Sequence, residues 1–201
     1  MAEPLSHHLL TMAYNNAWAN HRLYKACLQL SRDDFVARRA SFFPSIKSTL
    51  NHLLTVDWFY IQALECELRG EPPELDALRF FEPEEPFAEA GQLQREQSQT
   101  DRRLIAYCSQ LRDDQLQRYV SIVRPDRLQR DSRLRLLSHL FEHQIHHRGQ
   151  VHAMLAGTDV SPPQLDEFFC EGEADLRALD FAELGWSEAQ IWKPSGPSSQ
   201  G

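Results

Sequence analysis

Four of the nine histidines in this chain fall within one stretch, Leu136–Val151, which begins Leu-Leu-Ser-His and ends with His-His-Arg-Gly-Gln-Val. On a helical wheel of about 100° per residue, His143 and His147 fall inside or beside an arc of apolar side chains. That arc is formed by Leu136, Leu140, Val151 and Met154. Arg148 and His152 face away from it. The stretch is therefore predicted to be a helix that turns two imidazoles toward the protein interior.

Two buried imidazoles one turn apart need partners, and a divalent metal ion suits this spacing. A single buried histidine is more often bonded to a backbone carbonyl or a hydroxyl group. An i, i+4 pair is harder to satisfy in that way, because two neutral rings compete for few internal acceptors. The spacing alone leaves both interpretations open, and a third ligand elsewhere in the chain would favour the metal.

Apolar residues recur at helical spacing over four long segments, and these segments predict four helices. They cover about 6–30, 45–69, 88–111 and 132–156. Ser45 and Ser132 are placed to cap the second and fourth helices, and Gly70 and Gly157 are placed to end them. The stretch between the first two helices, 31–45, is predicted to link them. The expected class is all-α, a four-helix bundle.

Shorter features follow the same logic. The β-branched run 118–123 and the turn at 124–127 predict a small surface hairpin. Residues 1–170 are expected to form the bundle domain and residues 171–192 a short helical C-terminal extension, with a helix at about 173–184. The tail, 193–201, contains no hydrophobic residue and is predicted to be disordered.

Several polar residues interrupt the apolar faces of these helices. Asn16 and Asn20 do so in the first helix, where a structural tie to a neighbouring helix is favoured over a polar cavity. Asp57 lies in the middle of the inner face of the second helix, and His52 lies at its edge. A structural hydrogen bond is favoured for Asp57, to Asn16, Asn20, Trp18 or a backbone group. The alternative makes Asp57 a weak candidate for a catalytic or ligand-orienting carboxylate.

His52 could supply the third metal ligand, because bundles build metal sites from side chains on facing helices. Together with His143 and His147 it would give three neutral imidazoles. Such a set leaves a fourth position open on a tetrahedral ion, as catalytic zinc sites do.

Composition excludes some classes of function. The net charge is −8, from 29 acidic and 21 basic residues, and no basic block stands out, which argues against a nucleic-acid partner. No apolar run approaches a membrane span and the N-terminus does not resemble a signal peptide. The four cysteines, Cys27, Cys66, Cys108 and Cys170, are widely spaced and form no CxxC pair. We expect a protein of a reducing cytoplasm.

Three segments, taken together, resemble the DinB family of DinB/YfiT-like metalloproteins. They are Tyr14–Asn20, Ser45–Asp57 and His143–Gln150, in the family's order. The resemblance implies a four-helix bundle whose metal ligands are His52, His143 and His147, with His146 a neighbour rather than a ligand. It further implies zinc or nickel as the metal, thiol-dependent transferase or hydrolase activity in some members, and homodimers in many.

Three hypotheses follow. The first is a metal-dependent enzyme, a hydrolase or thiol S-transferase acting on a small-molecule substrate, which could itself be a thiol. The second is a non-catalytic stress-response protein that binds a metal or a small molecule. The third has no metal, with the histidines bonded internally.

Overall fold

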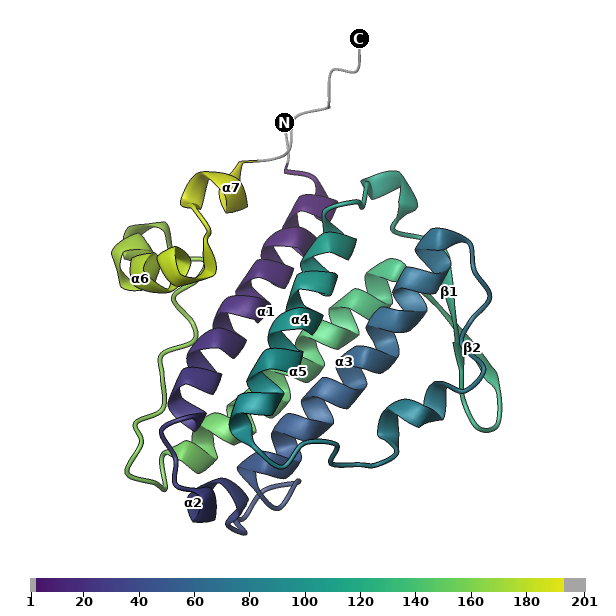
Figure 1. The fold of residues 1–201 in the computed structure, drawn as a ribbon. Coiled ribbons are helices and arrows are strands. Elements are labelled where there is room, and N and C mark those ends of the chain that lie inside the picture. Colours follow the sequence, from purple (N-terminus) through teal and green to yellow (C-terminus); the bar gives the residue numbers. More distant parts are fainter. Residues whose placement is uncertain (1–2, 194–201) are drawn as a thin grey trace.

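Four long helices lie side by side in the computed structural model of the chain, which describes residues 3–193 (Figure 1). They are α1 (Leu5–Cys27), α3 (Ile46–Arg69), α4 (Ala90–Cys108) and α5 (Arg133–Leu155). Both α4 and α5 contact α1 on one side and α3 on the other. The mostly helical fold that the apolar periodicity predicts is confirmed.

The shorter elements lie between and after these helices. They are α2 (Arg32–Val36), η1 (Ala77–Phe81), η2 (Asp113–Gln115), β1 (Tyr119–Val123), β2 (Leu128–Ser132), η3 (Glu171–Glu173), α6 (Ala174–Leu184) and α7 (Glu188–Trp192). The predicted hairpin is present, with β1 antiparallel to β2. The helices α2 and α7 were not predicted, because five residues are too few to show a helical period. Residues 194–201, most of the predicted disordered tail, lie outside the described part of the chain.

The ends of α3 and α5 are fixed by the residues expected to cap them. Ser45 Oγ accepts a hydrogen bond from the Ser48 backbone N–H at 3.0 Å, and Ser132 Oγ accepts one from the Arg135 backbone N–H at 3.3 Å. Gly70 ends α3 in the left-handed conformation, φ 71°. These caps fix the residues at which the two histidine-bearing helices begin and at which α3 ends.

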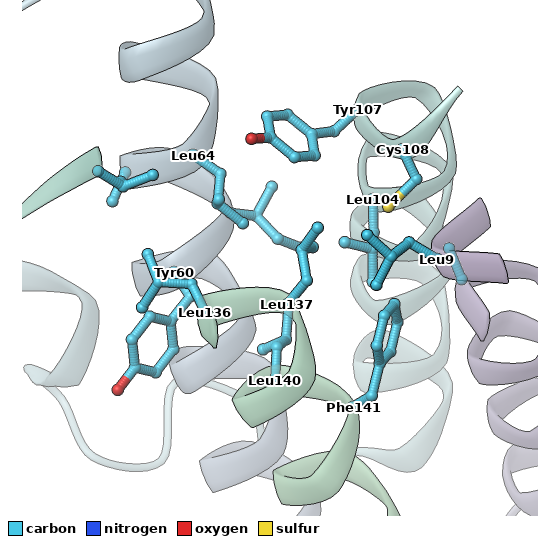
Figure 2. Close-up of a cluster of buried hydrophobic side chains, with 14 of the residues drawn as sticks. Leu9, Tyr60, Leu64, Leu104, Tyr107, Cys108, Leu136, Leu137, Leu140 and Phe141 are labelled. Atoms are coloured by element: carbon cyan, nitrogen blue, oxygen red, sulfur yellow. The ribbon is translucent and has the colours of Figure 1, made fainter. Parts of the chain in front are cut away.

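Two of the three apolar clusters among the described residues are stacked along the four long helices, and the third lies between α1 and the C-terminal segment. Figure 2 shows the first, in which side chains of α3, α4 and α5 surround Leu137 and meet Leu9 of α1. The second cluster, at the other end, includes Leu23, Leu50, Leu93 and Leu155. Each long helix contributes to both clusters, so burial of apolar surface holds all four together.

A buried polar layer separates these two clusters. Its members are Asn16 and Asn20 of α1, Asp57 of α3, Gln97 and Asp101 of α4, and Gln144 and Arg148 of α5. Both asparagines donate to Asp101 Oδ1, at 3.1 and 3.0 Å. Their predicted role as a structural tie is confirmed, because the bonds join α1 to α4.

The prediction that Arg148 faces away from the core is wrong. Its side chain is 4% exposed, and Nη1 donates to Asn20 Oδ1 at 3.1 Å, to Gln144 Oε1 at 3.2 Å and to Asn16 Oδ1. The wheel marked as buried only the arc where apolar residues gather. The buried side of α5 is wider, because polar residues that bond to α1 fill its remaining part.

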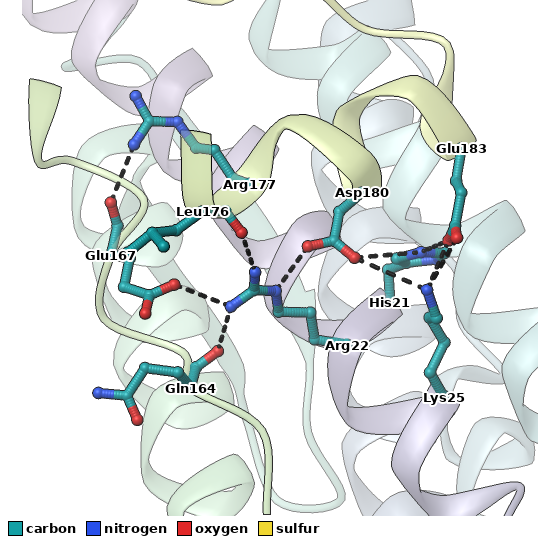
Figure 3. A network of polar contacts seen from close by, with 9 residues as sticks. All are labelled: His21, Arg22, Lys25, Gln164, Glu167, Leu176, Arg177, Asp180 and Glu183. Atoms are coloured by element: carbon teal, nitrogen blue, oxygen red, sulfur yellow. Dashed lines mark hydrogen bonds and ion pairs between the residues drawn. The ribbon is translucent and has the colours of Figure 1, made fainter. Parts of the chain in front are cut away.

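The C-terminal segment packs on the outer face of α1 through a network of charged groups, shown in Figure 3. Arg22 Nε donates to Asp180 Oδ2 at 2.6 Å, and Arg22 Nη1 donates to Glu167 Oε2 at 2.9 Å. Beside it, Phe168 packs against Trp18 with ring centroids 5.6 Å apart.

No helix in the described residues combines the length and apolar character needed to cross a membrane.

Candidate metal centre

The three histidines singled out in the sequence come together between α3 and α5. Nε2 of His52 lies 3.0 Å from Nε2 of His143. The ring of His147 is 4.7 Å from that of His52 and 4.5 Å from that of His143, centroid to centroid. One nitrogen of each ring lies within 4.8 Å of the other two. On α5, His143 and His147 directly precede Gln144 and Arg148, two members of the buried polar layer.

The surroundings of the group favour neutral imidazoles. Burial, with the nearby His147 adding to it, lowers the pKa of His52 from 6.5 to about 4. Burial, with a smaller contribution from the neighbouring histidines, lowers the pKa of His143 to about 3, and burial also lowers the pKa of His147. Metal ions bind neutral imidazole, so no proton has to be displaced at neutral pH.

Gln150 and His146 orient His147. Its Nδ1 lies 2.8 Å from Gln150 Oε1, so Nδ1–H donates to the carboxamide oxygen and Nε2 keeps its lone pair. The Gln150 amide nitrogen lies 3.1 Å from His146 Nε2. His146 therefore contacts Gln150, the side chain that orients His147.

Phe43 covers one side of the group. Its ring centroid lies 4.2 Å from that of His52 and 5.5 Å from that of His147. The ring restricts the orientation of both imidazoles and keeps water from that side. The side chain comes from the link between α2 and α3, where Pro44 and the Ser45 cap fix its position.

These side chains fit a divalent metal ion. Nitrogens bound tetrahedrally at about 2.0–2.1 Å from one ion are about 3.3 Å apart, close to the separation of the His52 and His143 nitrogens. Nδ1 of His143 is buried and makes no hydrogen bond within residues 3–193. Within the same residues no cysteine, carboxylate or fourth histidine joins the group. The group therefore offers a metal ion three neutral nitrogen donors and no charged ligand among the described residues.

Asp57 lies in the polar layer rather than among the three histidines. Its Oδ2 accepts from Gln97 Nε2 at 2.7 Å and from Gln144 Nε2. The structural role favoured for Asp57 is confirmed, but its partners are these two glutamines rather than Asn16, Asn20, Trp18 or a backbone group. Burial raises the pKa of Asp57 from 3.8 to about 7 and that of Asp101 to about 6, while it lowers the pKa of Arg148 to about 10. Gln144 directly follows His143 in α5. Its hydrogen bond therefore links Asp57 to α5 next to that histidine.

Sequence reasoning missed two supporting residues, Gln150 and Phe43. Gln150 follows His147 by three residues, a spacing that places both on the same helix face, and this could have been noticed. Phe43 carries no such signal. Its position depends on how the α2–α3 link folds back over α3, which no local pattern specifies.

A second group of suitable side chains is already satisfied. His21, Asp180 and Glu183 approach one another on the outer face of α1 (Figure 3). The ammonium group of Lys25 lies 2.7 Å from Glu183 Oε2 and 3.8 Å from Asp180 Oδ1. Since a cation occupies this cluster, it acts as an ion-pair network that holds α6.

Fold and site together define a mostly helical protein with a three-histidine group that could bind a metal. Comparison with known families agrees: the model of the DinB family matches residues 2–177, and the chain belongs to that family. The chain is also similar to Protein DinB of Bacillus subtilis (strain 168). The two are 26% identical over 144 residues, which cover 70% of this chain and 80% of the relative.

Proposed function

We propose that this protein is a metal-dependent enzyme of the DinB type, a hydrolase or thiol S-transferase acting on a small molecule. Its four long helices would form the family's four-helix bundle, with zinc or nickel held by His52, His143 and His147. We further expect a homodimer in the cytoplasm. Family membership and the three-histidine group support the proposal.

The observation that carries the proposal is the convergence of three neutral imidazoles without a fourth protein ligand in the described residues. A structural metal site is closed by four protein ligands, whereas a catalytic one keeps a position for water or substrate. A bound divalent ion would lower the pKa of a water or thiol there and so supply a nucleophile at neutral pH. Phe43 would exclude water from one side, and Gln150 would hold His147 in the binding tautomer.

A non-catalytic binding protein is the alternative, because the same three ligands would serve it. The half-exposed state of His52 and His143 favours an enzyme, since it leaves the group open to small molecules. A fourth position filled by a protein side chain in the metal-bound protein would instead favour the alternative.

The first experiment measures metal in protein purified without a histidine tag, then titrates zinc, nickel and cobalt at neutral pH. We expect about one equivalent per chain, and loss of binding in His143→Ala. His152→Ala is the matched control: it lies on the same helix, but its ring bonds to the Pro163 carbonyl. Less than about a tenth of an equivalent after titration would exclude the metal site.

The second experiment separates the two functions. Metal-loaded protein and the His143→Ala variant are screened for thiol conjugation of electrophiles and for hydrolysis of esters and amides. Turnover that needs both the metal and His143 supports the enzyme. Tight metal binding with no turnover across the screen supports the binding protein.

A further inference from the structure

Arg124 is a half-buried cation with no acidic partner among residues 3–193. It follows β1, and among residues 3–193 no carboxylate lies within ion-pair distance of its guanidinium. Its hydrogen bonds go to neutral groups: Nε donates to Gln129 Oε1 at 2.9 Å, and Nη2 donates to Tyr60 Oη at 2.8 Å. By contrast, the buried Arg133 and Arg177 each pair with a glutamate. Arg124 therefore keeps both its charge and the donors of Nη1 for another group.

The hairpin holds this guanidinium in a fixed place. The Arg124 backbone N–H donates to the Arg127 carbonyl at 2.9 Å across the turn that joins β1 and β2. The guanidinium lies over the rings of Phe59 and Tyr60 of α3, 4.8 and 5.7 Å from their centroids. Packing on two aromatic faces and two directional hydrogen bonds leave the side chain little freedom, so a ligand would meet a preorganised cation.

A row of rings joins Arg124 to the three histidines. Tyr60 packs edge-on against His139, with centroids 5.2 Å apart, and His139 is 6.1 Å from His143. On α3, Tyr60 follows His52 by two helical turns, a rise of about 12 Å. His139 is exposed, so the row is open to solvent on the α5 side.

We propose that Arg124 binds an acidic oxygen group, a carboxylate or a phosphate, at the far end of the substrate whose reacting group lies at His52, His143 and His147. Arg124 is thus a specificity-determining residue. The substrate is an anionic small molecule long enough to span two turns of α3. The inference rests on the proposed function, because it needs a reactive end at the three histidines.

Guanidinium chemistry sets the size of the effect. A hydrogen bond to a charged group contributes about 1.5–3 kcal/mol, which is about a 10- to 100-fold change in affinity. Arginine binds carboxylate and phosphate with the same paired geometry, so the two sources must be separated by experiment.

The test uses cobalt-loaded protein and two series of ω-mercapto compounds of graded chain length. One series ends in a carboxylate and the other in a neutral alcohol. A third series, which ends in a phosphate, is compared with the carboxylates to separate the two acidic groups. Binding of the thiolate to cobalt is followed by its absorption band. We expect acids to bind at least about 10-fold more tightly than alcohols only when the chain spans the two-turn separation. Short acids should show no such preference.

Arg124→Gln should remove the preference for acids while cobalt affinity and alcohol affinity stay unchanged. Arg130→Gln is the matched control, because Arg130 lies on the same hairpin but packs over Tyr119. It should keep the full preference. If Arg124 only stabilised the hairpin, Arg124→Gln would change urea unfolding but would leave the chain-length-dependent preference for acids as in the parent protein.

Equal binding of acids and alcohols at every length would overturn the inference, as would a preference that survives in Arg124→Gln. In both cases the proposed function would stand, because cobalt and thiols still bind. If cobalt binds but no thiol alters its absorption band, the inference that Arg124 binds the far end of a substrate held at the three histidines is overturned. If cobalt does not bind to the parent protein, the proposed function fails and this inference fails with it.

Discussion

Nδ1 of His147 lies 2.8 Å from the carboxamide oxygen of Gln150, and this contact determines which nitrogen of the ring is available to a metal. Removing the acceptor frees the ring to rotate and to exchange tautomers. Supporting contacts of this kind typically change metal affinity by about 10- to 100-fold. We therefore expect Gln150→Ala to weaken zinc binding to that extent, as measured by competition with a chelating dye.

Glu142→Ala is the control for Gln150→Ala, because Glu142 is exposed on the same helix. Its affinity for zinc should match that of the parent protein. Unchanged affinity in Gln150→Ala would show that packing against Phe43 is enough to orient His147.

The carboxyl group of Asp57 should make stability depend on pH. Burial raises its pKa to about 7 from 3.8, so the folded protein holds a proton that the unfolded chain releases between these values. Its contribution is complete below about pH 4 and is lost as the pH rises to about 7. Asp57→Asn resembles the protonated carboxyl. It should be more stable than the parent at about pH 8, by a few kcal/mol in order of magnitude, with a smaller difference at about pH 5.

Urea unfolding of both proteins at each pH provides the measurement. The lowered pKa values of the buried His52 and His143 have the opposite effect, because they reduce stability as the pH falls below about 6.5. Both proteins contain these histidines, so this effect cancels in the difference between their free energies of unfolding. The exposed Asp126→Asn is the control and should change the free energy of unfolding by less than about 0.5 kcal/mol. A difference for Asp57→Asn that is the same at both pH values would contradict the prediction.

Arg148 neutralises the polar layer. Its positive charge lowers the pKa values of both Asp57 and Asp101, against the effect of burial. Arg148→Leu leaves buried carboxylates without a counter-charge and leaves the oxygens of Asn16 and Asn20 without their donor. We expect a loss of about 3–5 kcal/mol in the free energy of unfolding, measured in urea.

A double variant tests the cause of that loss. Adding Asp101→Asn to Arg148→Leu removes one buried charge and should recover part of the stability. If the double variant is less stable than Arg148→Leu by the full effect of Asp101→Asn alone, the two residues are not coupled. The exposed Arg127→Leu should change stability by less than about 0.5 kcal/mol.

Arg22 holds the C-terminal segment to α1 through Asp180, Glu167 and two backbone carbonyls (Figure 3). In Arg22→Ala we expect faster hydrogen exchange over 164–193, because these contacts are lost together. Exchange in α3 and α5 should stay as in the parent protein, and so should metal affinity. Lys25→Ala should change exchange much less, because the Lys25 side chain is 43% exposed and its ion pairs are screened by water.

Much of the fold could be predicted from the sequence. The four long helices appear in the apolar spacing, and the caps at Ser45 and Ser132 fix the starts of α3 and α5, because these signals are local. The five-residue helices α2 and α7 escaped prediction because they are shorter than the window in which a period can be recognised. The burial of Arg148 escaped it because a wheel of apolar residues does not show a helix face that is buried through hydrogen bonds.

For the three histidines, too, the sequence predicted one part of the arrangement and the tertiary structure determined the other. The sequence by itself determined that His143 and His147 share a helix face and that His52 lies at the edge of another helix. Only the tertiary structure decided that Nε2 of His52 and Nε2 of His143 lie 3.0 Å apart, and that Gln150 and Phe43 hold the rings in place. The physical reason is that helical periodicity fixes direction around each axis. The distance between two helices and their relative height depend on how the apolar clusters and the polar layer of all four helices pack together.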